Sequence, residues 1–314
     1  MKFARVSAAL AARPGIVVAC SGGCDSLLLA DLAREVLPGR LRLVHVNHHL
    51  RQDASRDEAL VRRWSAQHEL PLQVVHLDPA ALRNQKSGLE AAARTARYRA
   101  LLEHTPTGWA LATGHHANDR LETLLLRLQQ GAGLSGLAGP RPVLRTGGRT
   151  VVRPLLHLWR ADLEKEAARR NLQYATDPSN LDLRHDRNRL RHEVIAPWLG
   201  QAAPAPLARS LALIAAERRL LRQLVAERLN PLLQQTEAGW RLPRTALIEA
   251  QPLLSCSLLR EALRRTAGGR PSAAFVRSVV TRASRPGPFE LHGEGLTLRA
   301  GRDWIEWPSL RQSV

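Results

Sequence analysis

The stretch that most constrains the fold is GIVVACSGGCDSLLLADLARE, at residues 15–35. An apolar, β-branched run passes through a Ser-Gly-Gly turn into a segment whose apolar residues recur at helical spacing. Gly22 and Gly23 allow the backbone to turn tightly and to approach an anion. The hydroxyls of Ser21 and Ser26, with the free N–H groups that begin the helix, are suited to binding phosphate. The stretch therefore predicts a buried strand followed by a phosphate-binding turn.

This turn differs from the common GxxxxGK[ST] phosphate loop, because it has no lysine that would reach a terminal phosphate. Asp25 brings a negative charge to the turn instead. A carboxylate at a phosphate site is expected where it binds Mg²⁺ or a cationic substrate, and where the turn holds pyrophosphate as a leaving group. Asp25 is therefore a candidate catalytic residue and a candidate Mg²⁺ ligand.

The first part of the chain alternates between predicted strands and predicted helices. Short runs rich in Val, Ile and Leu lie at residues 15–20, 41–47, 72–78 and 109–114. Segments with apolar residues at helical spacing lie between them, at residues 27–37, 57–69 and 91–104. This alternation predicts an α/β domain with a parallel sheet that helices cover on both faces.

A Pro- and Ala-rich segment at residues 197–208 predicts a domain boundary near Gly200. We therefore expect a catalytic domain at residues 1–200 and a smaller, mainly helical domain at residues 201–314. The alternating pattern and the glycine turns of residues 288–307 predict that the second domain ends in a β-hairpin.

Composition bears on the partner and the compartment. A formal net charge of +18 favours a nucleic-acid partner, because such a field attracts phosphate polymers. No run approaches the roughly 20 apolar residues of a membrane span, and arginines interrupt the first residues too often for a secretory signal, so we expect a cytoplasmic protein with no membrane partner. The three cysteines contain no CxxC pair, which argues against a disulfide framework or a thiolate metal site.

Polar clusters directly follow three of the predicted strands, at residues 21–26, 47–51 and 114–123. Ligands of open parallel sheets bind outside the carboxyl ends of the strands. We therefore expect the three clusters to converge on one edge of the sheet. Their histidines fit no standard zinc spacing, and binding to phosphate or backbone, or simple packing, is the preferred interpretation.

Asp119 and Glu122 lie three residues apart in the third cluster, so a helix would place both carboxylates on one face. They are candidates for binding an ammonium group, binding Mg²⁺ or accepting a proton, and the sequence does not rank these roles. Farther along, Arg187 and Arg191 would share a helical face, and each guanidinium group could bind a phosphate through two of its N–H groups. A merely solvated helix face is the alternative for both pairs.

The SGGxDS turn after the first strand resembles that of the PP-loop ATP pyrophosphatase superfamily, whose Rossmann-like domain is also described as adenine nucleotide alpha hydrolase-like. Four further segments are similar, in order and spacing, to the tRNA(Ile)-lysidine synthetase family. They lie at residues 45–51, 114–139, 151–156 and 177–199.

The resemblance implies ATP-dependent ligation of free L-lysine to C2 of the wobble cytidine of tRNA(Ile) with a CAU anticodon. ATP would adenylate the cytidine oxygen with release of pyrophosphate, and the lysine ε-amine would then displace AMP. The ammonium form of this group has a pKa of about 10.4, so it must lose a proton before the amine can attack. The resemblance further implies a C-terminal domain that contacts tRNA, and a homodimer.

The matching positions imply specific roles. Catalysis would involve Asp25, Asp119 and Glu122. Binding of ATP with Mg²⁺ would involve Ser21, Gly22, Gly23, Cys24, Asp25, Ser26, His48, Arg51 and His115. Binding of the tRNA or the amino acid would involve Asn180, Arg187, Asn188 and Arg191.

Three other functions remain open at this point. A tRNA sulfurtransferase with the same turn would need placed cysteines, of which only Cys24 is expected to be exposed. A glutamine amidotransferase would need a glutaminase nucleophile, which the N-terminal MKFA does not provide. A non-enzymatic RNA-binding protein would explain the charge but not the SGGCDS turn.

Overall fold

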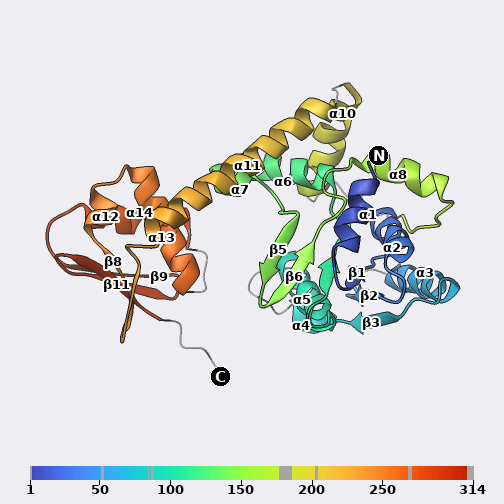
Figure 1. The fold of residues 1–314 in the computed structure, drawn as a ribbon, viewed down its shortest axis with the longest axis horizontal. Helices are drawn as coiled ribbons and strands as arrows, with labels where there is room; N and C mark the ends of the chain where they lie inside the picture. Colours follow the sequence, from blue (N-terminus) through green and yellow to red (C-terminus); the bar gives the residue numbers. More distant parts are fainter. Residues whose placement is uncertain are drawn as a thin grey trace. The chain divides into compact units, whose positions relative to one another are not determined.

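The structure, a computed structural model, describes residues 2–50, 53–83, 85, 88–176, 186–201, 204–267 and 271–309. The chain divides into two compact units, Met1–Ala215 and Ala216–Val314 (Figure 1). This division lies within helix α11 (Pro204–Leu229), and the expected boundary near Gly200 lies in α10 (Ala196–Gln201). None of the described helices has the length and apolar character needed to cross a membrane.

The first unit contains a six-stranded sheet in the order β3-β2-β1-β4-β6-β5. Its strands are β1 (Ile16–Ala19), β2 (Leu41–Asn47), β3 (Leu72–His76), β4 (Ala110–Ala112), β5 (Val143–Thr146) and β6 (Arg149–Val152). All neighbours pair in parallel except β5, which runs antiparallel to β6 at one edge. The first four strands correspond to the four predicted runs, and the α/β fold class is confirmed.

Helices cover both faces of this sheet (Figure 1). Besides α10 and the first part of α11, this unit contains the helices α1 (Ala4–Ala11), α2 (Cys24–Val36), α3 (Ala54–Gln67), α4 (Pro79–Arg83), α5 (Leu89–Glu103), α6 (Ala117–Gln129), α7 (Leu134–Leu137), α8 (Arg160–Arg169), α9 (Asp186–Arg189) and the π-helix η2 (Leu190–Ile195). Ile16 and Val18 of β1 pack in the core with α1, α2, α3 and α8, whereas Val17 packs on the other face with Leu101 of α5. Because successive strand residues face opposite ways, a continuous apolar run fits a strand buried on both faces.

The second unit packs helices against a five-stranded antiparallel sheet in the order β7-β8-β11-β10-β9. The strands are β7 (Gln234–Thr236), β8 (Gly239–Pro243), β9 (Phe289–Gly293), β10 (Leu296–Ala300) and β11 (Trp304–Pro308), and the helices are α12 (Thr245–Ile248), α13 (Pro252–Thr266) and α14 (Ala273–Ala283). The expected hairpin is present as β9 and β10. It continues into β11, which pairs with the earlier strand β8 to form the larger sheet.

A buried arginine joins several loops of the second unit. Arg244 is only 5% exposed, and its Nε donates to the carbonyl of Ala283 at 2.9 Å. Its Nη1 donates to the carbonyls of Gly287 at 2.9 Å and Gly301 at 2.7 Å, and its Nη2 donates to the carbonyl of Arg285. The guanidinium also lies 5.7 Å from the centre of the Phe289 ring. One side chain therefore provides the donors for four carbonyls from two separate segments, residues 283–287 and Gly301.

Candidate active site

The Ser-Gly-Gly turn between β1 and α2 is held by its own hydroxyls. Gly22 adopts a φ of 89°, in the left-handed region that favours glycine. Ser26 Oγ accepts from the Ser21 N–H at 3.1 Å, donates to the Gly23 carbonyl at 2.9 Å and lies 3.1 Å from Ser21 Oγ. Helix α2 begins at Cys24, so its first N–H groups and its positive dipole end adjoin the turn. This is the geometry that the sequence predicted for a phosphate-binding turn.

The first and third polar clusters are in contact, because β1 and β4 are adjacent parallel strands. A Cβ atom on Gly114 would lie 3.1 Å from the carbonyl carbon of Asp25, so glycine is what permits this approach. His116 Nε2 lies 3.5 Å from Asp25 Oδ2. The carboxylate in the phosphate turn and the histidine after β4 therefore form one group.

The second cluster lies at the same sheet edge but is bonded to other elements. His45 Nδ1 lies 2.9 Å from the Cys20 carbonyl, and burial lowers the pKa of this imidazole. Asn47 Nδ2 donates to Glu58 of α3 at 2.9 Å, and His49 Nε2 lies 2.8 Å from His76 Nδ1. The expected convergence thus holds for the strand ends, whereas the direct side-chain contact is between the other two clusters.

The remaining expected residues of these segments are placed as follows. His48 directly follows β2 and is partly buried. Asn188 lies in α9 beside Arg187 in the chain. Arg51 and Asn180 lie outside the described residues.

The predicted acid pair, Asp119 and Glu122, forms ion pairs with the predicted arginine pair, Arg187 and Arg191. Arg187 Nε donates to Glu122 Oε2 at 2.6 Å, and its Nη2 donates to Asp119 Oδ1 at 3.0 Å. Arg191 Nε donates to Glu122 Oε1 at 2.8 Å. Glu122 is fully buried, so its charge is balanced within the protein by these two guanidinium groups. Both arginines therefore lie on the acid pair, a placement that the sequence did not predict.

His116 connects this acid pair to the phosphate turn. Its backbone N–H donates to Asp119 Oδ2 at 2.8 Å, and its Nε2 lies 3.7 Å from the same oxygen. Burial works to lower the pKa of His116, but hydrogen bonding to Asp25 and the charges of Asp119 and Asp25 raise it above its usual value. Burial alone would raise the pKa of Asp119, yet the neighbouring histidines and Arg187 lower it. The site therefore favours a protonated His116 beside an ionised Asp119.

His115 has the opposite character. Its Nδ1 lies 2.8 Å from Thr113 Oγ1. Burial lowers its pKa to about 4; the charge of Asp119 opposes this shift, and those of Arg153 and Arg94 add to it. The ring is therefore neutral near pH 7 and can donate or accept a hydrogen bond without adding charge.

The depressed pKa of His115 predicts a pH-dependent loss of stability. Between pH 6.5 and about 4 the unfolded chain binds a proton at this histidine, whereas the folded protein does not. Lowering the pH through this window therefore favours unfolding, by at most about 1.4 kcal/mol per pH unit. Urea denaturation of His115→Gln is expected to show a shallower decline in the free energy of unfolding than the parent protein. The exposed His292→Gln is the control, and identical slopes for all three proteins would contradict the assignment.

Cys24 is buried, and the expectation that it would be exposed is wrong. It is the first residue of α2 and its side chain turns into the protein. Burial raises the pKa of its thiol to about 12, and the nearby charges of Asp25 and Glu164 add to the effect. This thiol is therefore not a thiolate at neutral pH.

Sequence reasoning did not single out His116 or Arg153. His116 had a usable signal, since it stands just before the first residue of a predicted helix, at the end of a strand. Arg153 is the first residue after β6 and is 7% exposed, but neither β5 nor β6 was among the predicted strands.

The chain is similar in sequence to known proteins over most of its length. Residues 2–197 match the model of a family described as a PP-loop domain. The tRNA(Ile)-lysidine synthase of Symbiobacterium thermophilum is 34% identical over 95% of this chain and 63% of its own length. That of Pseudomonas aeruginosa is 40% identical over 79% of this chain and 57% of its own length. The chain thus spans less than two thirds of these relatives.

Among solved structures, the U34-tRNA thiolase NcsA from Methanococcus maripaludis with its [4Fe-4S] cluster has a TM-score of 0.54. The similarity covers 70% of this chain and 77% of that chain at 16% identity, and it therefore shows a shared fold alone.

Proposed function

This chain belongs to the PP-loop family, and on that premise we propose that it is a tRNA(Ile)-lysidine synthase. It would join free L-lysine to C2 of the wobble cytidine of tRNA(Ile) with a CAU anticodon, at the expense of ATP. The observation that carries the proposal is the contact between Asp25 of the phosphate turn and the His116–Asp119 pair. This contact supports the proposal, because bound ATP would then lie close to the carboxylates of Asp25 and Asp119.

The phosphate turn would hold the leaving end of ATP. The Ser21 hydroxyl and the N–H groups at the start of α2 would donate to the β- and γ-phosphates, while Ser26, whose hydroxyl donates to the Gly23 carbonyl, would hold the turn in shape. The cytidine O2 would attack the α-phosphorus, and the bond to the pyrophosphate oxygen would break. His116, held protonated beside Asp25, adds a positive charge next to this turn.

Asp25 also fits a role as Mg²⁺ ligand. Its carboxylate is 30% exposed and lies at the phosphate turn. The described residues contain no group of three or more His, Cys, Asp or Glu side chains that could hold a metal by themselves. A site of one carboxylate completed by substrate phosphates and water is a usual one for Mg²⁺, which would neutralise charge on the phosphates.

The acid pair would take the lysine. Asp119 is ionised and Glu122 is buried, so an ammonium group that displaced Arg187 from Asp119 would find a ready counter-charge. The ε-amine must then lose its proton before it attacks C2, and Asp119, the acid of the pair that is not fully buried, would accept it. Attack forms the C–N bond, and AMP leaves with the former O2.

Sulfur transfer is less well supported. Cys24 at the turn is buried with a pKa of about 12, and Cys20 is buried with a pKa of about 11. Persulfide chemistry requires a reactive thiolate, and neither of these thiols provides one. Lysine ligation needs no cysteine.

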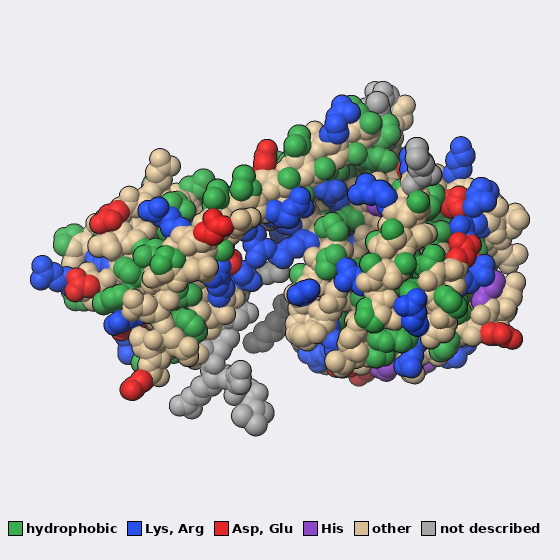
Figure 2. All heavy atoms as spheres, viewed as in Figure 1, with side chains coloured by type: hydrophobic (Ala, Val, Ile, Leu, Met, Phe, Trp, Pro, Cys, Tyr) green, Lys and Arg blue, Asp and Glu red, His purple; other side chains and the backbone are tan. Residues whose placement is uncertain are grey.

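We further propose a cytoplasmic homodimer whose second unit contacts the tRNA. The chain has 46 Lys and Arg residues against 28 Asp and Glu residues, and Figure 2 shows Lys and Arg side chains on the face of each unit that it draws. Such a surface suits a phosphate polymer.

One assay tests the proposed function. The protein is mixed with Mg²⁺, ATP, labelled lysine and a tRNA(Ile) transcript that carries the CAU anticodon. Label is expected in the RNA, with AMP and pyrophosphate formed in equal amounts to it. A transcript with uridine at the wobble position is the control and should take no label. Release of AMP without lysine in the RNA would overturn the proposal.

A further inference from the structure

Arg94 and Arg153 lie near enough to His115 for their charges to lower its pKa, and Arg97 lies with Arg94 at the ring of Tyr98. Arg153 is the first residue after β6, where Val152 pairs with Ala112 of β4. The Thr113 N–H donates to the Val152 carbonyl at 3.1 Å, and Thr113 Oγ1 lies 2.8 Å from His115 Nδ1. Arg153 therefore lies at the same sheet edge as the phosphate turn, next to the strand that carries the third cluster.

The other two arginines come from the middle of α5. Arg94 Cζ lies 5.1 Å and Arg97 Cζ 5.9 Å from the centre of the Tyr98 ring, so both guanidinium groups adjoin one aromatic side chain. Arg94 is exposed and Arg97 is partly buried. The burial of Arg97 and the nearby charges of Arg94 and Arg187 lower its pKa, which shows that positive charge accumulates here.

These side chains lack the partners that the other arginines of the site have. Arg187 and Arg191 pair with Asp119 and Glu122, but none of Arg94, Arg97 and Arg153 forms an ion pair with a carboxylate of the described residues. Arg153 Nη1 donates to the Arg141 carbonyl at 2.8 Å, while its Nε is buried without a hydrogen-bond partner in the described part of the chain. The hydroxyl of Tyr98 is likewise buried without a hydrogen-bond partner in the described residues. A buried polar atom without a partner in the protein is generally a place where a ligand, a water or an ion binds.

The ligand that fits such a group is an anion with several oxygens. Free lysine is a poor candidate for the whole set, because its two ammonium groups would be repelled by three neighbouring guanidinium groups. Arg94 is exposed and Arg153 is buried. Such a set of arginines suits a nucleic-acid backbone, one part of which lies in solvent while another part holds a single base at the site. Tyr98 adds an aromatic face of the kind that unstacked bases use.

We propose that Arg94, Arg97 and Arg153, with Tyr98, form the subsite that holds the RNA phosphodiester adjoining the base to be modified. This inference rests on the proposed function, since it assumes that the substrate is RNA. It adds the residues that hold the backbone beside the reacting base.

The test is RNA binding by the Arg94→Ala/Arg97→Ala double variant. The probe is a fluorescent anticodon stem-loop with the CAU sequence, titrated at several salt concentrations. We expect the Kd to rise at least about tenfold and the slope of log K against log salt to fall by about 1.4, as for two lost contacts to single-stranded phosphates. The Kd for ATP should stay within about twofold of the parent value, because the phosphate turn is untouched.

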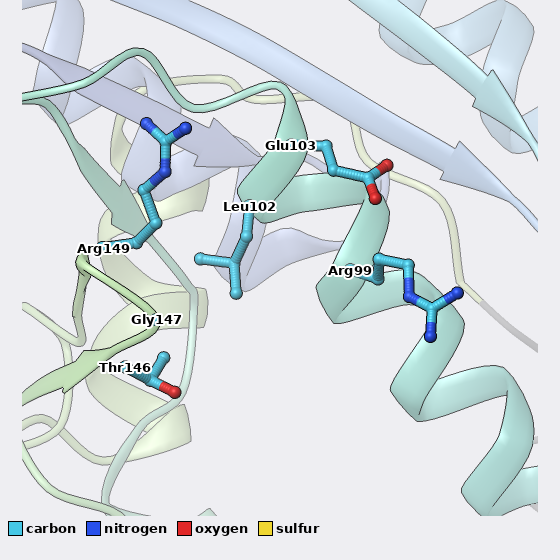
Figure 3. A pocket seen from close by; sticks show the side chains of 6 residues that line it. All are labelled: Arg99, Leu102, Glu103, Thr146, Gly147 and Arg149. Atoms are coloured by element: carbon cyan, nitrogen blue, oxygen red, sulfur yellow. The ribbon is translucent and has the colours of Figure 1, made fainter. Parts of the chain in front are cut away.

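Arg99→Ala is the matched control, because it removes the same charge from the same helix. Arg99 lies in the second half of α5, where it lines a cavity of about 360 Å³ with Thr146 and Arg149 (Figure 3). Residues 146–149 form the turn between β5 and β6, which lies at the amino end of β6. This control should bind RNA as the parent protein does. Thermal melting of each variant checks that it is folded.

Arg153→Lys gives a second, independent measurement. It keeps the charge but removes the planar pair of donors, so we expect weaker RNA binding with an unchanged salt slope. Unchanged RNA affinity in the double variant, or an equal loss in Arg99→Ala, would overturn the subsite. So would a raised KM for lysine or ATP at unchanged RNA affinity, because the anion would then belong to a small substrate. Failure of the proposed function has a separate signature: the parent protein would bind the RNA without forming lysidine.

Discussion

Replacement of Asp119 by asparagine is expected to abolish lysidine formation, with a rate loss of about 10²- to 10⁴-fold. The amide has almost the shape of the carboxylate, so it can still accept from the His116 N–H, a bond of 2.8 Å in the parent protein. It has no negative charge to hold an ammonium group against Arg187, and it cannot take a proton from the amine. Label incorporated from lysine into tRNA(Ile), at saturating ATP, measures the effect.

Asp186→Asn is the matched control for this prediction. Asp186 is an exposed acid that pairs with Arg189 at 2.6 Å, one residue from Arg187 in the chain. It has the same chemistry without contact to the acid pair, so this variant should retain the parent rate within about twofold, as surface changes usually do. Full activity of Asp119→Asn, in protein that melts at the parent temperature, would remove Asp119 from the catalytic group.

Replacement of Arg244 by alanine is expected to unfold the second unit. The side chain is 5% exposed and donates to four carbonyls, of which that of Ala283 belongs to a buried residue. A hydrogen bond from a charged group contributes about 1.5 to 3 kcal/mol, so the loss of all four is expected to cost at least about 4 kcal/mol. A domain is stable by only about 5 to 15 kcal/mol. Hydrogen exchange should show lost protection in β9, β10 and α14, while the strands of the first unit stay protected.

Arg241→Ala provides the comparison for that result. Arg241 lies in β8, three residues before Arg244, and its guanidinium lies 4.0 Å from the centre of the Trp304 ring. It bonds to Gln234 at the surface rather than to backbone carbonyls. We expect a loss of stability below about 1 kcal/mol from this change. Equal melting temperatures of Arg244→Ala and the parent protein would show that the four carbonyls find other donors.

The sheet and the phosphate turn were predictable because their signals are local. Ile16, Val17 and Val18 form a continuous apolar run, and only a strand buried on both faces accounts for such a run before a glycine turn. Strands β5 and β6 gave a weaker signal, since their sequences VLRT and RTVV mix apolar with polar residues and Val143 at the sheet edge is 41% exposed. The hairpin of the second unit was predicted from adjacent strands, whereas its pairing with β8 joins residues far apart in the chain.

The candidate site was likewise predictable only where its signals are local. Asp119 and Glu122 share a helix, so their spacing alone places them on one face. Their binding to Arg187 depends on where α9 lies in the folded protein, and the bonded residues are 65 and 68 positions apart. Burial of Cys24 is likewise a property of the packed protein, since the N-terminal turn of a helix can face either solvent or core.

The π-helix η2 affects how this segment tolerates changes of length. Loss of one residue from an α-helix rotates everything beyond it by about 100°. A π-helical turn already contains one residue more than an α-helical turn, because its hydrogen bonds span five residues instead of four. Deletion of a single residue at positions 192–194 would convert η2 to ordinary helix and keep α10 in phase with α9. Evolution can therefore shorten the chain at this point by one residue without turning Arg187 away from Glu122.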